Sequence, residues 1–272
     1  MRTNKAINTL RLLTLRTIVA AIALLVLCCS QVSLAQQSQP RTFASASTAC
    51  RALYQAVRNN DEPAIQAILG VGPELTSTGN PTEDKLNRER FVQKYQEMHR
   101  LVLEPDGTTT LYIGAENWPF PFPLVSKDGK WHFDSEAGAR EILARQIGQN
   151  EITAIDVCEA FATMRGPQIN RTADQDATEK FASALANNTN VKSGNIESFR
   201  GYQFKLATGK PADLLLVAYP AEYRSSGVMT FILTPDGSLY EKDLGPQTST
   251  LAKQVQGRST GDWVAVQLDP VP

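Results

Sequence analysis

Two histidines, His99 and His132, are the side chains in this sequence best suited to proton transfer near neutral pH. Acidic and phenolic groups stand near them along the chain: Tyr95, Glu97, Glu116 and Asp134. If folding gathers these groups in one pocket, they can serve as acid and base in a hydrolase or an isomerase. Their spacing does not indicate that they converge. The residues by themselves therefore predict no catalytic site.

Other motifs that carry chemistry are absent from the sequence. The two histidines stand far apart without a patterned carboxylate cluster, so they do not fit the ligand spacing of a zinc site. No glycine pattern matches a phosphate-binding loop, and Ser225-Ser226-Gly227 does not match the G-x-S-x-G pattern of a nucleophile elbow. We therefore expect no metal, no cofactor and no catalytic residues, and we expect that the protein is not an enzyme.

The segment Trp118-Pro-Phe-Pro-Phe-Pro123 alternates aromatic rings with prolines. One interpretation is an exposed surface of polyproline type that binds a peptide or a glycan. The simpler interpretation is an edge or connecting segment whose prolines block strand pairing and whose rings pack into the core. The candidate ligand or partner surface combines this segment with nearby rings: Trp118, Phe120, Phe122, Trp131, His132 and Tyr95.

The N-terminus has the pattern of a secretory signal peptide. Four basic residues are followed by an apolar run over residues 18–29, and no acidic residue occurs before Asp61. Ser33-Leu34-Ala35 supplies the small residues that a signal peptidase accepts, and the apolar run is short for a membrane span. We predict a signal peptide over residues 1–35, cleaved after Ala35, and export to the periplasm or the extracellular space.

Two alternatives to cleavage after Ala35 stay open. Cys28 or Cys29 can be a lipoprotein cysteine, and the apolar run can remain as an uncleaved anchor. After cleavage we expect no membrane span, and we predict a polar linker over residues 36–42.

The net charge and the cysteines of the mature chain limit which partners and which chemistry are possible. Removing residues 1–35 takes away four of the 27 basic residues and none of the 28 acidic ones, which leaves a net charge of −5. No basic stripe is available to neutralise phosphates, so we expect no nucleic-acid partner. Cys50 and Cys158 remain, each on a predicted helix, and the sequence leaves open a disulfide or two buried free thiols.

Helices are expected to lead into a sheet in the first half of the mature chain. Helical spacing covers residues 43–57, residues 63–69 and a helix capped by Thr82 that continues to His99. Strands are expected over residues 109–114, 122–127 and 130–134, the last two joined by the hairpin turn Asp128-Gly129. We predict a domain over residues 43–148 that contains helices and a bent antiparallel sheet.

A second domain is expected over residues 149–272. Gly148 is predicted to end one helix, and Asn150 is predicted to cap another over residues 151–164. Alternating apolar residues and the Pro235-Asp-Gly237 turn then predict a second small antiparallel sheet. The predicted fold class is therefore α+β.

Three separate blocks of this sequence resemble one family. They are NWPFPFPLVSKDGKWHFD (residues 117–134), EILARQIGQNEITAIDVCEAF (residues 141–161) and VAYPAEYRSSGVMTFILTPDGSLYEKDLG (residues 217–245). The family is the bacterial exported domain-of-unknown-function family numbered 2950, and the resemblance implies export to the envelope without an established activity. At the level of fold, the first half is similar to the cone of nuclear-transport-factor-two-like domains. The second half is similar to the globular head of pseudopilins.

These patterns support one main functional interpretation and two alternatives. The main one is an exported, non-catalytic binding or envelope-accessory module whose partner is an envelope protein, a peptide or a glycan. The first alternative is a cone-fold hydrolase or isomerase with a pocket near Tyr95, Trp118 and His132. The second is a structural component of a pilus or a secretion-type assembly. A deep polar pocket that contains His132 and a carboxylate would favour the enzyme. An exposed aromatic shelf at residues 118–122 would favour the binding module, and a large apolar patch on the helix over residues 151–164 would favour the assembly.

Overall fold

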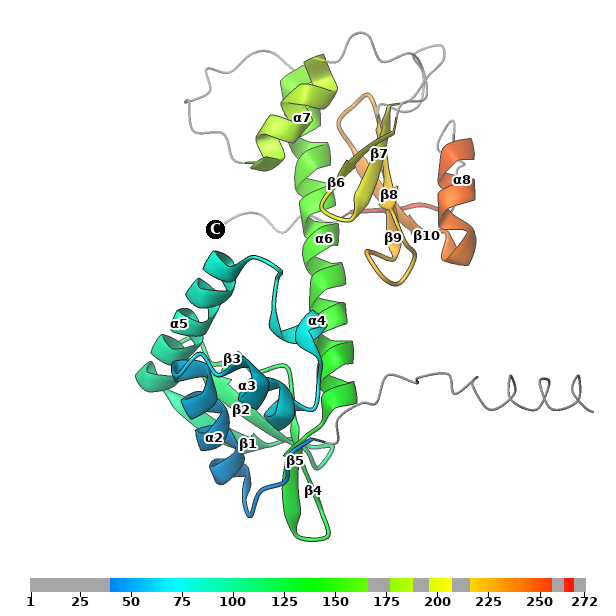
Figure 1. Ribbon diagram of the computed structural model, residues 1–272. Helices are drawn as coiled ribbons and strands as arrows, with labels where there is room; N and C mark the ends of the chain where they lie inside the picture. The colour runs from blue at the N-terminus through cyan, green and yellow to red at the C-terminus, as the bar shows by residue number, and fades with distance from the viewer. Residues whose placement is uncertain (1–39, 166–176, 188–195, 207–215, 256–261, 267–272) are drawn as a thin grey trace, which may run out of the picture.

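The structure is a computed structural model that describes residues 40–165, 177–187, 196–206, 216–255 and 262–266. Within these ranges two lobes lie one after the other along a single long helix, α6 (Ser135–Arg165) (Figure 1). The predicted signal peptide over residues 1–35, its cleavage after Ala35 and residues 36–39 of the predicted linker lie outside the described residues. No helix in the described ranges is both long enough and apolar enough to cross a membrane.

Two short capped helices begin the first lobe. In α2 (Ala46–Arg58) the Ser45 hydroxyl accepts a hydrogen bond from the Thr48 N–H at 3.1 Å. In α3 (Glu62–Leu69) the Asp61 carboxylate accepts from the Ala64 N–H at 3.1 Å. These side chains satisfy N–H groups that the first turn of a helix leaves without a partner.

A one-turn helix, α4 (Pro73–Thr76), leads through a loop to α5 (Pro81–Glu97). The cap of α5 is Asn80, whose side chain accepts from the N–H groups of Thr82 and Glu83, so the prediction of Thr82 as cap was wrong. Pro81 fits the first helical position because its missing N–H would have no partner there. The helix ends at Glu97, so His99 is not helical.

The first sheet is antiparallel and stands beside these helices. Its strands are β1 (His99–Leu103), β2 (Thr109–Ile113), β3 (Trp118–Pro119), β4 (Leu124–Lys127) and β5 (Lys130–Phe133). The order is β1-β2-β4-β5, and β3 pairs with β2. The predicted Asp128-Gly129 hairpin is confirmed, because Lys127 pairs with Lys130 and both turn residues have positive φ, 52° and 73°.

Strand β1 was not predicted. Its residues are mostly exposed, so no alternation of buried and exposed side chains marks it in the sequence. Pairing with β2 from His99↔Ile113 to Leu103↔Thr109 creates it, and Glu104 and Gly107 close the hairpin through an N–H to carbonyl bond of 3.0 Å. The backbone ladder at a sheet edge, rather than side-chain burial, therefore decides this element.

Helix α6 passes through the predicted break without interruption. It contains 31 residues, and Gly148 and Asn150 both lie inside it. The predicted helix end at Gly148 and the new cap at Asn150 were therefore wrong. Gly148 costs about 1 kcal/mol of helix propensity relative to alanine, a penalty that packing on both sides of this position outweighs. Ile142 packs against the first core, and Ala154, Val157 and Phe161 belong to the second.

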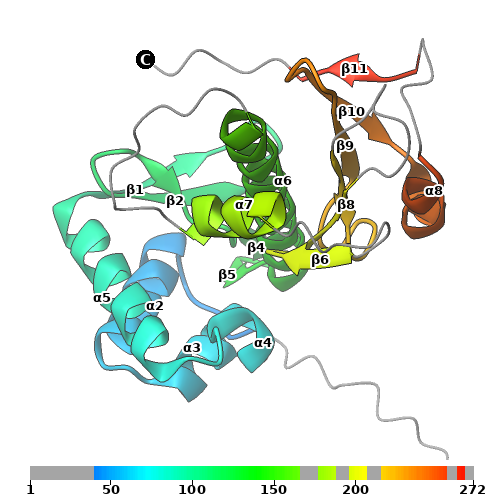
Figure 2. The same cartoon turned by 90° about the horizontal axis from the view of Figure 1, so that it is seen from above.

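The second sheet is also antiparallel. Its strands are β6 (Ile196–Phe199), β7 (Tyr202–Leu206), β8 (Leu216–Pro220), β9 (Met229–Leu233), β10 (Leu239–Asp243) and β11 (Val264–Ala265), in the order β11-β10-β9-β8-β7-β6. Helices α6 and α7 (Ala177–Asn187) cover one face, and α8 (Thr248–Gln254), which follows the 3-10 turn η1 (Gly245–Gln247), covers the other (Figures 1 and 2).

One carboxylate of α6 attaches the second sheet to the helix. Glu151 Oε1 accepts from the N–H groups of Val228 and Met229 at 2.8 and 3.0 Å, where β9 begins. One residue earlier, Asn150 Nδ2 donates to the Ser226 carbonyl at 2.9 Å. The two residues that were predicted to start a new helix, Asn150 and Glu151, thus attach the second sheet to the continuous helix α6.

The α+β class with two antiparallel sheets is confirmed in the described residues. One core draws its buried residues from positions 43–133, and two clusters that pack on the second sheet draw theirs from positions 154–239 and 217–252. The division into domains at residue 148, and the cone-like and pseudopilin-like resemblances, stay predictions.

Two glycines of α6 provide a matched test of its continuity. A Cβ at Gly138 would overlap the ring of Phe122, whereas a Cβ at Gly148 would meet open space. Gly138→Ala should lower the free energy of unfolding by about 1–3 kcal/mol through overpacking. Gly148→Ala should raise it by about 0.5–1 kcal/mol through helix propensity. Urea unfolding followed by circular dichroism measures both, and destabilisation by Gly148→Ala would contradict a continuous helix.

Candidate functional site

A cavity of about 610 Å³ opens in the first lobe between α2, α3, α5, the sheet and α6. Its walls are mostly apolar and come from segments far apart in the sequence. The apolar side chains that line it are Leu53, Val57, Ile65, Leu69, Leu75, Phe91, Ile113, Trp118, Phe120, Pro121, Phe122 and Ile142. The cavity therefore belongs to the fold of the whole lobe rather than to one motif.

The proline-rich segment forms the aromatic wall of this cavity. Phe122 is buried, Phe120 is half-buried and Trp118 is 40% exposed. The ring centroids of Trp118 and Phe120 lie 6.4 Å apart, and Phe120 lies 5.7 Å from both Phe122 and Phe91. The interpretation of rings packed into the core holds for Phe122, while Trp118 reaches from the cavity to solvent.

A cation covers part of Trp118. The Arg145 guanidinium on α6 lies 4.9 Å from the centroid of a Trp118 ring, and its Nε donates to Glu141 at 2.7 Å. A guanidinium over an indole is stabilised by the negative face of the ring. Trp118 is therefore held in one orientation, with part of its surface against Arg145 and part against the cavity.

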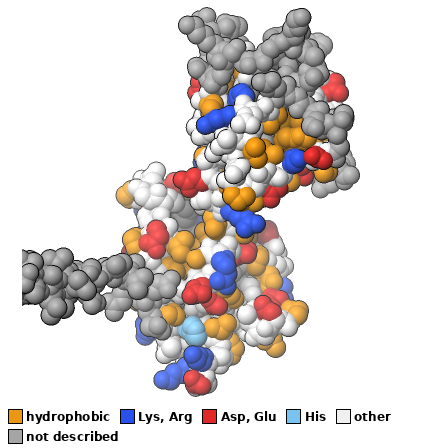
Figure 3. Space-filling model, turned by 90° about the vertical axis from the view of Figure 1, so that its right-hand side faces the viewer, with side chains coloured by type: hydrophobic (Ala, Val, Ile, Leu, Met, Phe, Trp, Pro, Cys, Tyr) orange, Lys and Arg blue, Asp and Glu red, His pale blue; other side chains and the backbone are white. Residues whose placement is uncertain are grey.

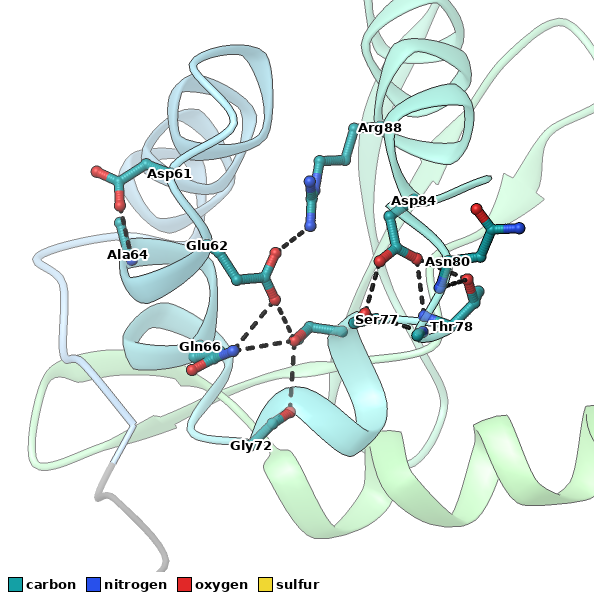
Figure 4. A network of polar contacts seen from close by, with 12 residues as sticks. Asp61, Glu62, Ala64, Gln66, Gly72, Ser77, Thr78, Asn80, Asp84 and Arg88 are labelled. Carbon is teal, nitrogen blue, oxygen red and sulfur yellow. Dashed lines mark hydrogen bonds and ion pairs between the residues drawn. The ribbon is translucent and has the colours of Figure 1, made fainter. Parts of the chain in front are cut away.

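One wall of the cavity is built by a polar network that centres on Glu62 (Figure 4). The Glu62 carboxylate of α3 forms an ion pair with Arg88 of α5 and accepts from the Thr76 hydroxyl and, at 3.1 Å, from Gln66. The Glu62 and Arg88 side chains are both only about a quarter exposed, at 27% and 21%. Partial burial strengthens such a pair relative to a surface pair, so the network fixes the spacing of α3, α4 and α5.

A second carboxylate orders the loop after α4. Asp84 accepts from the Ser77 hydroxyl at 2.5 Å and from the Thr78 N–H and hydroxyl at 2.7 and 2.8 Å (Figure 4). The hydrogen bond from Ser77, followed by that from the Thr78 N–H, lowers the pKa of Asp84 below its ordinary value. Asp84 is thus an ionised structural acceptor and is poorly suited to act as a general base.

The cations that line the cavity differ in their partners. Arg88 is paired with Glu62, and Lys94 lies 2.7 Å from Glu116, whose pKa is lowered by that hydrogen bond. The described residues offer Arg90 no ion-pair partner, and its Nη1 donates to the Asn87 amide oxygen at 3.2 Å.

The other predicted site residues lie outside the cavity lining. Tyr95 is buried in α5 with its ring stacked on Tyr54 and His99, at centroid distances of 4.6 and 4.0 Å, and desolvation raises its pKa to about 12. Trp131 forms a backbone bridge to Phe43 at the start of the lobe. His132 alternates with Trp131 and Phe133 along β5 and is paired with Val125. Of the six, Trp118, Phe120 and Phe122 meet at the cavity.

The sheet order separates the two histidines. His99 lies on β1 and His132 on β5, the two ends of the order β1-β2-β4-β5. Three strand spacings of about 4.8 Å place these strands roughly 14 Å apart. The gathering of His99 and His132 in one pocket, considered as an alternative, does not occur, and neither histidine lines the cavity.

Polar lining residues on α5 were missed by reasoning from the sequence. Asp84, Arg88, Phe91 and Tyr95 follow one another at spacings of four, three and four residues, so they share a stripe of the helix. The sequence signal for these lining residues was this helical spacing, in which two charged residues precede two aromatic ones on the same face. Leu86, which was expected to pack, is 53% exposed.

Neither metal-binding clusters nor activated thiols occur in the described ranges. No group of three or more His, Cys, Asp or Glu residues there is arranged to hold a metal ion. Cys50 and Cys158 are buried free thiols, and desolvation raises the pKa of Cys50 to about 12 and that of Cys158 as well. Burial thus keeps both in the unreactive protonated form.

Fold and site together define an α+β protein with a mostly apolar cavity in its first lobe. The family model described as "Protein of unknown function (DUF2950)" matches residues 40–198 and 186–265. The chain therefore belongs to this family. No curated protein and no solved structure matches it.

The structural role of Asp84 predicts a pH-dependent stability. Because folding lowers the pKa of Asp84, its ionised form stabilises the protein at any pH above the ordinary carboxyl pKa of about 4. This stabilisation is lost as the pH falls through the lower pKa that Asp84 has in the folded protein. Asp84→Asn should therefore lower Tm at pH 7 and leave it nearly equal to wild type in strong acid. Thermal melts from pH 7 to pH 2 measure this.

The control is Glu89→Gln, on the exposed part of the same helix, where the ion pair with Lys85 spans 3.9 Å. An exposed pair of this kind contributes at most about 0.5 kcal/mol, so its Tm should change little at any pH. An Asp84→Asn deficit that stayed constant across the whole pH range would contradict the role assigned to the Asp84 charge.

Proposed function

We propose that this protein is an exported, non-catalytic binding module, and that the cavity of its first lobe takes an apolar ligand or an apolar side chain of a partner. The single observation that carries the proposal is the cavity itself. Its volume of about 610 Å³ falls in the range of small-molecule sites, about 300–1,000 Å³, and its lining is mostly apolar and aromatic.

The polar network supports the proposal because it keeps the cavity from collapsing when no ligand is bound. Glu62 ties α3 to α5 and to α4, while Asp84 ties α5 to the loop after α4. These bonds set the separation of the helices, so the apolar walls cannot approach without breaking partly buried polar contacts. An apolar ligand would recover contacts that the walls otherwise lack.

The arrangement of ionisable groups favours binding over catalysis. The carboxylates in the lining, Glu74 and Asp84, accept hydrogen bonds from Gly72 and from Ser77 and Thr78, so each has a structural partner. Neither His99 nor His132 lies beside them. The assembly alternative gains little, because most apolar residues of positions 151–164 pack against α7 and the second sheet, and Ile152 is the large one left exposed, at 54%.

Export rests on the N-terminal sequence pattern, and the partner's class rests on the cavity. The basic start, the apolar run over residues 18–29 and Ser33-Leu34-Ala35 support secretion. On the face shown in Figure 3, acidic and basic side chains are interspersed, which gives no support to a nucleic-acid partner. An apolar small molecule, or an apolar side chain of an envelope peptide or protein, fits the proposal.

A neutral apolar fluorophore tests the cavity directly. N-phenyl-1-naphthylamine added to the mature chain should fluoresce with a titration that saturates at one site per chain. Ile142→Trp, which enlarges a side chain in the lining on α6, should weaken the affinity about tenfold or more.

The matched control is Ile152→Trp, ten residues further along the same helix and exposed in the second lobe. Its titration should equal that of wild type, and thermal melts verify that both variants are folded. No enhancement by the wild type, or an equal effect of the two substitutions, would overturn the proposed function.

A further inference from the structure

Two exposed polar side chains on α5, both part of the cavity lining, present hydrogen-bond donors. Arg90 Nη1 donates to the Asn87 side-chain oxygen at 3.2 Å, and both residues belong to the lining. That bond uses one lone pair of the Asn87 oxygen, and the Asn87 amide N–H₂ and the remaining guanidinium N–H groups stay available as donors to a ligand. A pair of this composition is complementary to an acceptor, and most strongly to an anion.

Most other polar groups of the lining already have strong partners. Arg88 is paired with Glu62, Lys94 with Glu116, and the hydroxyls of Ser77 and Thr78 donate to Asp84. Glu74 accepts from the Gly72 N–H at 3.2 Å. Among the charged side chains of the described lining, Arg90 is thus the cation without a carboxylate partner.

We propose that the ligand of the cavity is an amphiphile with an apolar body and a single anionic head group, the head held by Asn87 and Arg90 and the body by the aromatic wall. This inference rests on the proposed function, because it names the ligand class of the same cavity. The occupant follows from charge complementarity: a guanidinium that has no ion-pair partner among the described residues, and an amide donor, belong to the same lining as Phe91 of this helix.

Three ligands that share one apolar chain but differ in head group separate the contribution of the head from that of the chain. Decanoate, decanol and decyltrimethylammonium share the apolar chain and differ in charge, and each can displace N-phenyl-1-naphthylamine from the mature protein at pH 8. Decanoate should bind about tenfold more tightly than decanol, and the ammonium more weakly than either. Arg90→Gln should reduce the preference for decanoate over decanol about tenfold, because it removes the positive charge that distinguishes the two heads.

The matched control is Lys85→Gln, which removes a cation from the same helix at a position outside the lining. This variant should keep the full preference for decanoate, which distinguishes a local contact from the general charge of the lobe. A second variant, Asn87→Leu, removes the amide donor and should reduce the same preference.

The outcomes distinguish the two proposals. If all three ligands displace the fluorophore equally, or if Arg90→Gln and Lys85→Gln behave alike, the anionic head is overturned while the apolar site stands. If the fluorophore itself does not bind, the proposed function fails and the ligand class fails with it. A preference for decanoate that depends on Arg90 and Asn87 supports both.

Discussion

The first lobe depends on the ion pair between Glu62 and Arg88, which joins helices that contribute little apolar surface to each other. Helix α5 has only Leu86, Phe91, Val92 and Tyr95 as large apolar residues in 17 positions, and Leu86 faces solvent. Burial of Phe91, Val92 and Tyr95 places this helix against the first core. The Glu62 carboxylate, which also accepts from Thr76 and Gln66, fixes its separation from α3 and α4. Because both charged groups are partly shielded from water, their attraction is stronger than that of a surface pair.

As a consequence, polar contacts connect the helices of the first lobe while a cavity remains between them. The helices are held at a separation that their apolar side chains do not fill, and the rings of residues 118–122 form one wall of the remaining space. In most cores such a void costs stability, since its lining loses dispersion contacts. This void, bounded by hydrogen-bonded carboxylates on one side and aromatic rings on the other, is the site that the proposed function assigns to a ligand.

Helix α6 connects this lobe to the second through one continuous backbone. Gly138 makes room for Phe122 near its start, and Glu151 receives the β9 strand near its middle. Its 31 residues span about 46 Å at the usual rise, so each lobe packs on its own stretch of the helix. The two lobes therefore share an element without sharing a core.

The sequence by itself determined the Asp128-Gly129 turn, several helices and strands, the α+β class and the family, because these patterns depend on neighbouring residues. It also identified residues 118–122 as a special segment. Only the tertiary structure decided the continuity of α6 and the existence of β1, since both depend on packing and pairing with distant residues. The same holds for the site: Leu53, Arg90 and Ile142 share one cavity lining with Trp118 through the fold, and no spacing along the chain encodes a cavity whose walls come from seven separate segments.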